Sequence, residues 1–275
     1  MPKITDIYNF KHENLIIEKP SEETANTTPP MKYLRANIKA RYPDGNIGDL
    51  IIVTETLFSK GIKSGFTTDS GEVTGYVLPL NAYDRDGATP KQAKWVIAFE
   101  NLIEACKEHV FTNRKDYKKP RLDKAFLNKF ASSVFWWPED EETGLRVLEK
   151  GPTLYPKLLY KKATQEIKTR FYRMGTTIKL DDPLSLLDQY GLARAALKIE
   201  SIFASGDKIK LQVKVLEVDF KVQDSGMDRL LPAISLDDDD DEASELQKDS
   251  KESNGSVEAS DSDSDYVPSS KVARK

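Results

Sequence analysis

The sequence is poor in the residues on which most metal and catalytic centres depend. Its 275 residues include one cysteine, Cys106, and two histidines, His12 and His109. A single cysteine excludes an internal disulfide and a cysteine-based zinc site, and this usage predicts an intracellular protein. Two histidines are too few for a histidine metal cluster and argue against histidine-dependent catalysis. We therefore expect neither a bound metal ion nor another cofactor.

Long apolar runs are also missing. No stretch approaches the roughly 18 apolar residues that a membrane-spanning helix needs, and the first 20 residues have no apolar segment of the signal-peptide kind. The Walker phosphate-binding motif, the glycine-rich dinucleotide motif and the HExxH zinc motif do not occur. We therefore expect no membrane association and no enzymatic activity.

Charge of the two signs is separated along the chain. The formal net charge is −4, but residues 237–275 contain 13 Asp or Glu and 5 Lys or Arg, which leaves a net charge of +4 on residues 1–236. This composition predicts a disordered acidic tail that contacts protein partners, although it would also serve solubility alone. Serines beside acids suit acid-directed kinases. The tail residues assigned to partner contact are Asp237, Asp238, Asp239, Asp240, Asp241, Glu242, Asp261, Asp263 and Asp265, and the phosphorylation candidates are Ser262 and Ser264.

The body is predicted to be rich in strands. Residues 1–32 show no hydrophobic period and contain Pro29-Pro30, so we expect a flexible N-terminal segment there. Apolar and polar residues alternate from Tyr33 onward, as in a strand with one buried face. In residues 207–222 the apolar phase slips by one residue at Val215-Leu216, which predicts a β-bulge. The predicted strands are 33–42, 50–58, 73–80, 153–162 and 166–173 as a hairpin, 194–204 and 207–222.

One helix interrupts this pattern. Apolar residues at three- and four-residue spacing predict an amphipathic helix over 90–112, with Thr89 as N-cap and Gln92 completing a capping box. A second helical segment is predicted at 122–131, and a helical turn after Asp182-Pro183. Since strands and helices do not alternate, we do not expect a parallel doubly wound sheet. The pattern favours a mainly β domain over residues 33–236, an oligonucleotide-binding-like antiparallel barrel with a helical insertion at about 90–131.

Basic and aromatic residues interleave on the predicted strands. Proteins that bind single strands need this mixture, because cations neutralise phosphates and flat rings stack on unpaired bases. The plainer alternative is that the lysines form the solvated face of a sheet and the aromatic residues its core. Of the adjacent rings of Trp136 and Trp137, we expect one in the core and the other as a stacking platform. The predicted DNA-binding residues are Lys157, Tyr160, Lys161, Lys168, Arg170, Tyr172, Lys198, Lys208, Lys210, Lys214, Trp137, Arg114, Lys118 and Lys119.

Two pairs of acids raise a nuclease as a third interpretation. Asp181-Asp182 and Glu217 with Asp219 are the pairs from which a two-metal site would be built. However, Asp182 before Pro183 is a helix-start signal, and Glu217 and Asp219 occupy outward positions of a predicted strand. We therefore do not assign a catalytic residue.

The C-terminal half of the body resembles a known family. The segments GPTLYPKLLY, IKTRFY and ALKIESIFASGDKIKLQVKVLEVDF, between residues 151 and 220, resemble the single-stranded DNA-binding proteins of nucleo-cytoplasmic large DNA viruses. These are similar to the acidic-tailed single-stranded DNA-binding protein of short-tailed coliphages. The resemblance implies an oligonucleotide-binding barrel with an inserted helix and a tail that contacts replication proteins. The tail departs from the phage pattern, because its last aromatic residue, Tyr266, is followed by basic residues.

The sequence thus predicts a non-enzymatic single-stranded DNA-binding protein of viral DNA replication, recombination and repair, without strong sequence preference. Its expected partners are single-stranded DNA and, through the tail, viral replication proteins, with self-association left open. Its expected location is the host nucleus or a cytoplasmic virus factory. The alternative is a β-barrel interaction or virion protein whose basic face meets an acidic protein partner.

The charge separation leads to a first testable prediction. Truncation after Leu236 should tighten binding to single-stranded DNA at low salt, because a tail of charge −8 competes with DNA for the same basic groups. The gain should shrink at higher ionic strength, where salt screens both competitors. Titration of the full chain and of residues 1–236 at two salt concentrations measures the effect. Equal affinities at low salt would show that the tail takes no part in DNA binding.

Overall fold

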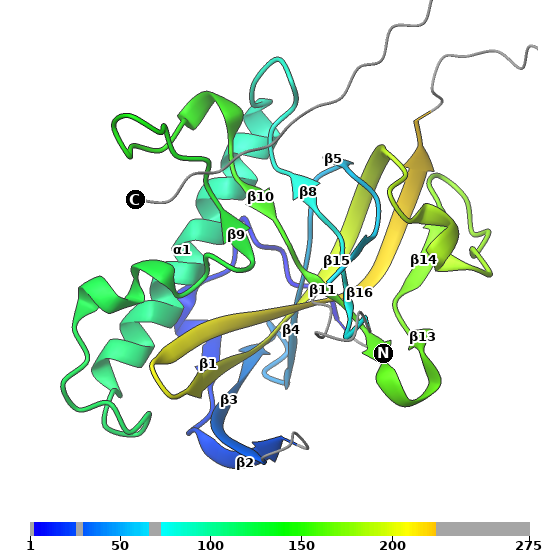
Figure 1. Ribbon diagram of the computed structural model, residues 1–275. Coiled ribbons are helices and arrows are strands. Elements are labelled where there is room, and N and C mark those ends of the chain that lie inside the picture. The colour runs from blue at the N-terminus through cyan, green and yellow to red at the C-terminus, as the bar shows by residue number, and fades with distance from the viewer. Residues whose placement is uncertain (1–2, 26–29, 66–72, 224–275) are drawn as a thin grey trace, which may run out of the picture. The chain divides into compact units, whose positions relative to one another are not determined.

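The computed structural model of the protein describes residues 3–25, 30–65 and 73–223, and this part of the chain is mainly β (Figure 1). The tail residues predicted to contact partners or to be phosphorylated lie outside the described residues. The described strands form a sheet of fourteen strands and a separate pair, β12–β13. The strands are β1 (Leu15–Ile17), β2 (Ser21–Ala25), β3 (Met31–Arg41), β4 (Ile47–Val53), β5 (Leu57–Ser59), β6 (Lys63–Ser64), β7 (Tyr76–Val77), β8 (Leu80–Asn81), β9 (Phe135–Trp136), β10 (Thr153–Leu154), β11 (Lys157–Leu158), β12 (Tyr160–Lys161), β13 (Glu166–Ile167), β14 (Arg170–Arg173), β15 (Gly191–Ser205) and β16 (Lys208–Val222).

Helical segments connect these strands. The one α-helix of the described residues, α1, spans Pro90–Thr112, and the 3-10 turns are η1 (His12–Asn14), η2 (Lys124–Lys129), η3 (Leu148–Lys150), η4 (Lys162–Thr164) and η5 (Pro183–Leu186). The predicted capping box of α1 is confirmed: the Gln92 backbone N–H donates to Thr89 Oγ1, and the Thr89 N–H donates to Gln92 Oε1. The helix expected at 122–131 is the short turn η2, and Asp182 caps η5 as predicted.

The hairpin of β15 and β16 runs through the centre of the sheet. The two strands pair antiparallel from Gly191 and Val222 to Ser205 and Lys208, with two breaks in register. At the first break Ala196 pairs with Glu217 and Leu197 with Val215, so Leu216 is the extra residue of a bulge on β16. This confirms the bulge predicted from the phase slip. A second extra residue, Glu200, follows on β15, and two bulges on partner strands bend the hairpin strongly.

Both outer edges of this hairpin carry further strands. On one side β15 pairs with β3, β4 and β5, all antiparallel. On the other side β16 pairs with β11 and β14, both parallel. The expectation of a wholly antiparallel sheet and of a long hairpin over 153–173 is therefore wrong. Only β12 and β13 form the hairpin, because the segments flanking them leave it to join the edge of β16.

The sheet is not closed into a barrel. Its hydrogen-bonded path runs from β6 through β7, β11, β16, β15, β5, β8 and β10 to β9, and within the described residues the first and last strands of this path do not pair. Short strands at both ends explain the difference from the predicted barrel, since closure requires two long edges in register. The mainly β class and the inserted helix are as predicted.

The N-terminal segment also differs from the expectation. Residues 15–17 and 21–25 form β1 and β2, which pair along β3, so this part of the predicted flexible segment belongs to the sheet. One edge of β3 pairs with β15, so the backbone N–H and C=O groups on its opposite edge need other partners, which β1 and β2 provide. The hydrophobic pattern of the sequence does not reveal that β3 needs these backbone partners. β2 has the sequence Ser-Glu-Glu-Thr-Ala and is paired chiefly through its backbone.

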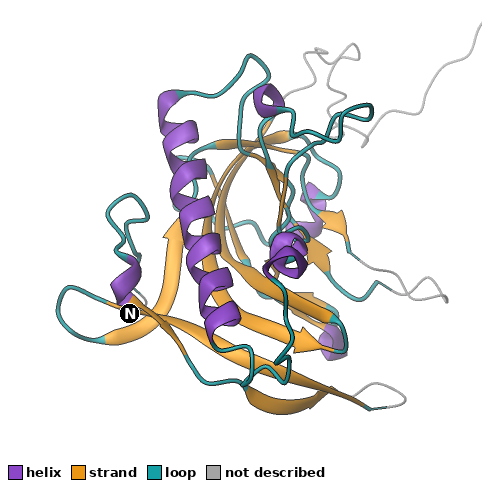
Figure 2. Cartoon of the chain, turned by 90° about the vertical axis from the view of Figure 1, so that its left-hand side faces the viewer, coloured by secondary structure: helices purple, strands orange, loops and turns teal. Residues whose placement is uncertain are grey.

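The core lies between the sheet and α1, which runs lengthwise across one face of the sheet (Figure 2). The helix contributes Trp95, Phe99, Leu102 and Cys106, all at most 1% exposed. The indole N–H of Trp95 donates to the Val53 carbonyl at 2.8 Å and so fixes the helix to β4. Burial raises the pKa of the Cys106 thiol to about 12, so this cysteine is a neutral core residue. No helix in the described part of the chain is long and apolar enough to cross a membrane.

Thr169 holds the parallel strands to the centre of the sheet. Its hydroxyl donates to the Val215 carbonyl of β16 at 2.7 Å and accepts the Leu159 N–H at 2.8 Å, and the residue is 2% exposed. Thr169→Val should lower the free energy of unfolding by about 1–3 kcal/mol, because it leaves two buried backbone groups without partners. Urea denaturation measures this change. Thr177→Val, at an exposed position, is the control and should change stability by less than about 0.5 kcal/mol.

Candidate nucleic-acid interface

The face of the sheet opposite the core carries three lysines in one row. Lys198 of β15 pairs with Lys214 of β16, and Lys214 pairs with Lys157 of β11, so the three side chains project from the same face of adjacent strands. Neighbouring strands lie only about 4.8 Å apart. The next position on each strand is fully buried on the core side: Leu197, Val215 and Leu158. We call the opposite face the outward face.

This row raises the local electrostatic energy of the folded protein. Like charges directly opposite one another destabilise a sheet. The pKa of Lys157 is lowered, first by burial, which disfavours the charged form, and then by the nearby charges of Lys214 and Lys210. Lys198 is partly compensated by Asp49 at 2.7 Å, and Glu200 pairs with Arg35 at 3.3 Å. Glu200 also attracts the charge of Lys157, so acids of the fold offset part of the repulsion along the row.

The outward face continues onto β14. Arg170 is exposed and pairs with Glu217 of β16 at 2.9 Å, and Tyr172 is half-buried beside Asp219. Phe171 between them is fully buried in the core. Arg170 and Tyr172 therefore both lie on the outward face. The ion pair also gives Glu217 a structural partner, and the described residues contain no group of three or more His, Cys, Asp or Glu placed to hold a metal ion.

The remaining lysines of the predicted set lie around this face. Lys210 is on the outward face, opposite Phe203, and Lys208 is exposed where β16 begins. Lys168 is exposed next to β14 and pairs with Glu166 at 2.5 Å. The separate pair β12–β13 carries Lys161, which is exposed, and Tyr160, whose ring contacts the ring of Tyr76 edge-on at 5.2 Å. The structure therefore brings together Lys157, Arg170, Tyr172, Lys198, Lys210 and Lys214, with the others at the border.

Trp137 is the core ring of the tryptophan pair, so its assignment to the DNA-binding set is wrong. It is 9% exposed, and its indole N–H donates to Glu100 Oε1 at 2.9 Å. Trp136 is 45% exposed and is the ring that faces solvent. Trp136 ends β9 and Trp137 follows it, so the two adjacent side chains point to opposite sides, but the sequence does not say which of them turns inward.

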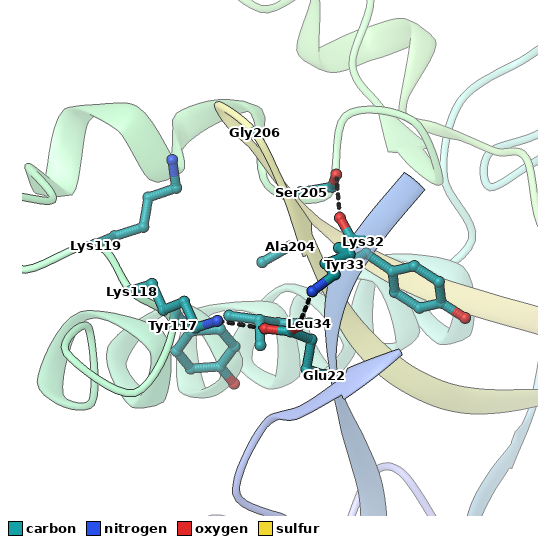
Figure 3. Close-up of a pocket in the computed structure, with 10 residues that line it drawn as sticks. All are labelled: Glu22, Lys32, Tyr33, Leu34, Tyr117, Lys118, Lys119, Ala204, Ser205 and Gly206. Atoms are coloured by element: carbon teal, nitrogen blue, oxygen red, sulfur yellow. Dashed lines mark hydrogen bonds and ion pairs between the residues drawn. The ribbon is translucent and has the colours of Figure 1, made fainter. Parts of the chain in front are cut away.

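Arg114, Lys118 and Lys119 lie at the other end of the hairpin, not on the outward row, and each contacts a protein acceptor. The guanidinium of Arg114 donates to the carbonyls of Phe111 and Pro120. Figure 3 shows Lys118 and Lys32 converging on Glu22 at a small pocket of about 180 Å³, and Lys119 pairs with Asp207 at 3.4 Å. The density of cations in this part of the sequence predicted a DNA-binding site. In the structure these cations contact backbone carbonyls or carboxylates of the protein.

Arg194 is an exposed cation of this face that the sequence analysis missed. Arg194 of β15 lies in phase with Lys198 and opposite Asp219, between the lysine row and the end of the hairpin. Extending the two-residue period of β15 backward from Lys198 identifies it. It was overlooked because the surrounding sequence, Leu-Ala-Arg-Ala-Ala, is otherwise apolar.

The lysine row generates a prediction on stability. Lys214→Gln should raise the pKa of Lys157 toward its ordinary value and stabilise the fold by about 0.2–1 kcal/mol at low salt, because it removes the central charge of the row. NMR titration of Lys157 and urea denaturation measure the two effects. Lys115→Gln removes one charge from an exposed lysine elsewhere and should leave both quantities unchanged. A destabilised Lys214→Gln protein would contradict the proposed repulsion.

Comparison with known proteins gives two viral relatives. The uncharacterized protein 007R of Invertebrate iridescent virus 3 is 23% identical over 215 residues, which cover 76% of this chain and 45% of the relative. The early 31 kDa protein of Frog virus 3 (isolate Goorha) is 27% identical over 169 residues, which cover 60% of each protein. The chain thus spans about half the length of these curated relatives.

A family profile matches nearly the whole chain. The match runs over residues 8–263 and therefore includes the sheet, α1 and every residue of the outward face. Both relatives are viral, so the family occurs in viruses. The chain belongs to the family described as "Protein of unknown function (DUF2738)".

Proposed function

We propose that this protein binds single-stranded DNA across the outward face of its sheet, without enzymatic activity and without strong sequence preference. The observation that carries the proposal is the row of Lys198, Lys214 and Lys157 on adjacent strands. Three cations on adjacent strands offer a polyanion closely spaced partners for successive phosphates.

The chemistry around the row supports nucleic acid as that partner. Tyr172 and Arg170 lie on the same face as the lysines, and a tyrosine ring stacks on an unpaired base whatever the base is. Arg170 adds a planar cation that suits phosphate oxygens, once it exchanges Glu217 for the ligand. Bases in a duplex are already stacked on each other, so exposed rings favour a single strand. This combination is the basis for choosing DNA over an acidic protein, the alternative partner.

The proposal extends to the role and the fold. Viral relatives and the resemblance to viral single-stranded DNA-binding proteins support a role in viral DNA replication, recombination and repair, with the acidic tail contacting replication proteins. The fold would be an open form of the oligonucleotide-binding architecture, in which bulges at Leu216 and Glu200 bend the sheet without closing it. The host compartment, nucleus or virus factory, follows the site of viral replication.

Fluorescence anisotropy with labelled oligonucleotides at several salt concentrations tests the proposal. The protein should bind single-stranded DNA more tightly than duplex, and log K should fall with log salt by about 0.7 for each phosphate contact. The double variant Lys210→Gln with Lys214→Gln should bind more weakly and reduce this slope by about 1.4, because two contacts are removed.

Polyglutamate is the control ligand, since it has the charge of DNA but no bases. It should compete poorly with single-stranded DNA at equal charge concentration. Equal competition would favour the acidic protein partner instead, and a salt-independent affinity or tighter duplex binding would contradict single-strand binding across this face.

A further inference from the structure

A second row of side chains crosses the outward face at the far end of the central hairpin. Six neighbouring strands, β9, β10, β8, β5, β15 and β16, contribute one residue each, and successive residues are paired partners. Paired positions of antiparallel strands project from the same face of a sheet. In order, the row is Trp136, Thr153, Asn81, Phe58, Leu192 and Lys221.

This row forms the floor of a groove of about 1160 Å³. The ring of Tyr83 forms part of the wall and is held against the backbone of Gly151, where a Cβ would lie only 2.3 Å from the ring. Gly151 has a φ of 64°, so both its conformation and the close ring require glycine. The contact with Gly151 therefore fixes the position of the Tyr83 ring in the wall.

Two apolar side chains of the groove, those of Trp136 and Leu192, are exposed and are not part of the core. Trp136 is 45% exposed and Leu192 40%, while the adjacent Trp137 fills the core position. Phe58 is half-buried in the groove and stacks on Tyr190, outside the groove lining, at 5.9 Å with an interplanar angle of 18°. Exposed rings that face a hollow are typical of a ligand site rather than of a solvated surface.

Polar groups lie between the two rings of the floor. Trp136 and Phe58 are separated by three strand spacings, which is about 14 Å. Asn81 and Thr153 occupy the two strands between them, and the threonine hydroxyl donates to the Asn81 carbonyl oxygen at 3.4 Å. The amide NH₂ of Asn81 donates to no protein group among the described residues, and Asn81 lines the groove.

Charge in the groove is positive on balance. Lys60, Arg85, Lys150 and Lys221 line it, against two acids, Asp84 and Glu149. One of these acids already has a partner, because Asp84 accepts a hydrogen bond from the Gln92 side chain at 3.0 Å. An anionic ligand with flat rings fits this combination better than an apolar peptide does.

We propose that this groove binds unpaired nucleobases of a single DNA strand, with Trp136 and Phe58 as stacking platforms and Asn81 donating to a base edge between them. The inference rests on the proposed function and adds a base-binding subsite to it. Leu192 of the groove and Lys198 of the lysine row are both outward residues of β15, six residues or about 20 Å apart, with Arg194 between them. One strand of DNA can therefore place its bases in the groove and its phosphates along the lysines.

The experiment uses the full chain and two labelled probes of equal length, an oligothymidylate and an abasic phosphodeoxyribose oligomer. The wild-type protein should bind the oligothymidylate more tightly, and only this probe should quench tryptophan fluorescence, since Trp95 and Trp137 are buried. Trp136→Ala should weaken oligothymidylate binding roughly 5- to 150-fold, remove the quenching, and leave the affinity for the abasic oligomer unchanged. Trp136→Phe keeps a ring and should retain the preference for bases.

Phe126→Ala is the matched control, because this ring is 42% exposed but lies outside the groove. It should change neither affinity. Unchanged oligothymidylate binding by a folded Trp136→Ala protein overturns the base-binding groove and leaves DNA binding by the lysine row standing. Equal wild-type affinity for both probes, with no quenching, overturns the groove without any variant. A wild-type protein that binds neither probe overturns the proposed function and the groove together.

Discussion

The backbone pairing of β15 with β16 is the interaction on which the rest of the structure depends. Two strands of fifteen residues pair over nearly their whole length, and each of them presents its other edge to further strands. β3, β4 and β5 join one edge, and β11 and β14 join the other. The inner side chains of the hairpin form the floor of the core beneath α1, and its outer side chains form both the lysine row and one end of the aromatic groove. Core and candidate binding surface are thus two faces of one pair of strands.

Because one pair of strands forms both faces, alternate residues along it meet opposite requirements. Inward positions such as Leu197 and Val215 are fully buried and stabilise the sheet, whereas the outward positions next to them, Lys198 and Lys214, repel each other across the same backbone. The repulsion costs little compared with the burial, because each like-charged pair contributes on the order of 0.2–1 kcal/mol and each buried aliphatic side chain about 1.5–3 kcal/mol. The fold can therefore carry a cationic face. The two bulges, at Leu216 and Glu200, keep the inward phase on the core while they bend the strands.

Local patterns in the sequence predicted those features whose cause is local. The capping box of α1 needs only Thr89, Pro90 and Gln92, and the bulge at Leu216 is visible as a phase slip within one strand. Features that depend on distant partners were not predictable. The parallel docking of β11 and β14 depends on the Thr169 hydroxyl meeting Val215, 46 positions later in the chain, and the roles of Arg114, Lys118 and Trp137 depend on which acceptors the fold brings near them. The aromatic groove combines six strands from five stretches of chain, which no single segment reveals.

The central position of β15 and β16 has a consequence for synthesis. The strands on which all others assemble are the last part of the body to be made, since residues 191–222 follow every element that pairs with them. Translation proceeds at about 5–20 residues per second. The strands that pair with this hairpin are therefore made before it and lack these partners until it is complete; they are β3, β4, β5, β11 and β14. Contacts of such high sequence separation fold slowly and expose strand edges to aggregation meanwhile. The lysine row, which needs Lys157, Lys198 and Lys214 together, arises only once the hairpin is in place. A nascent chain therefore cannot present this surface before its body is complete.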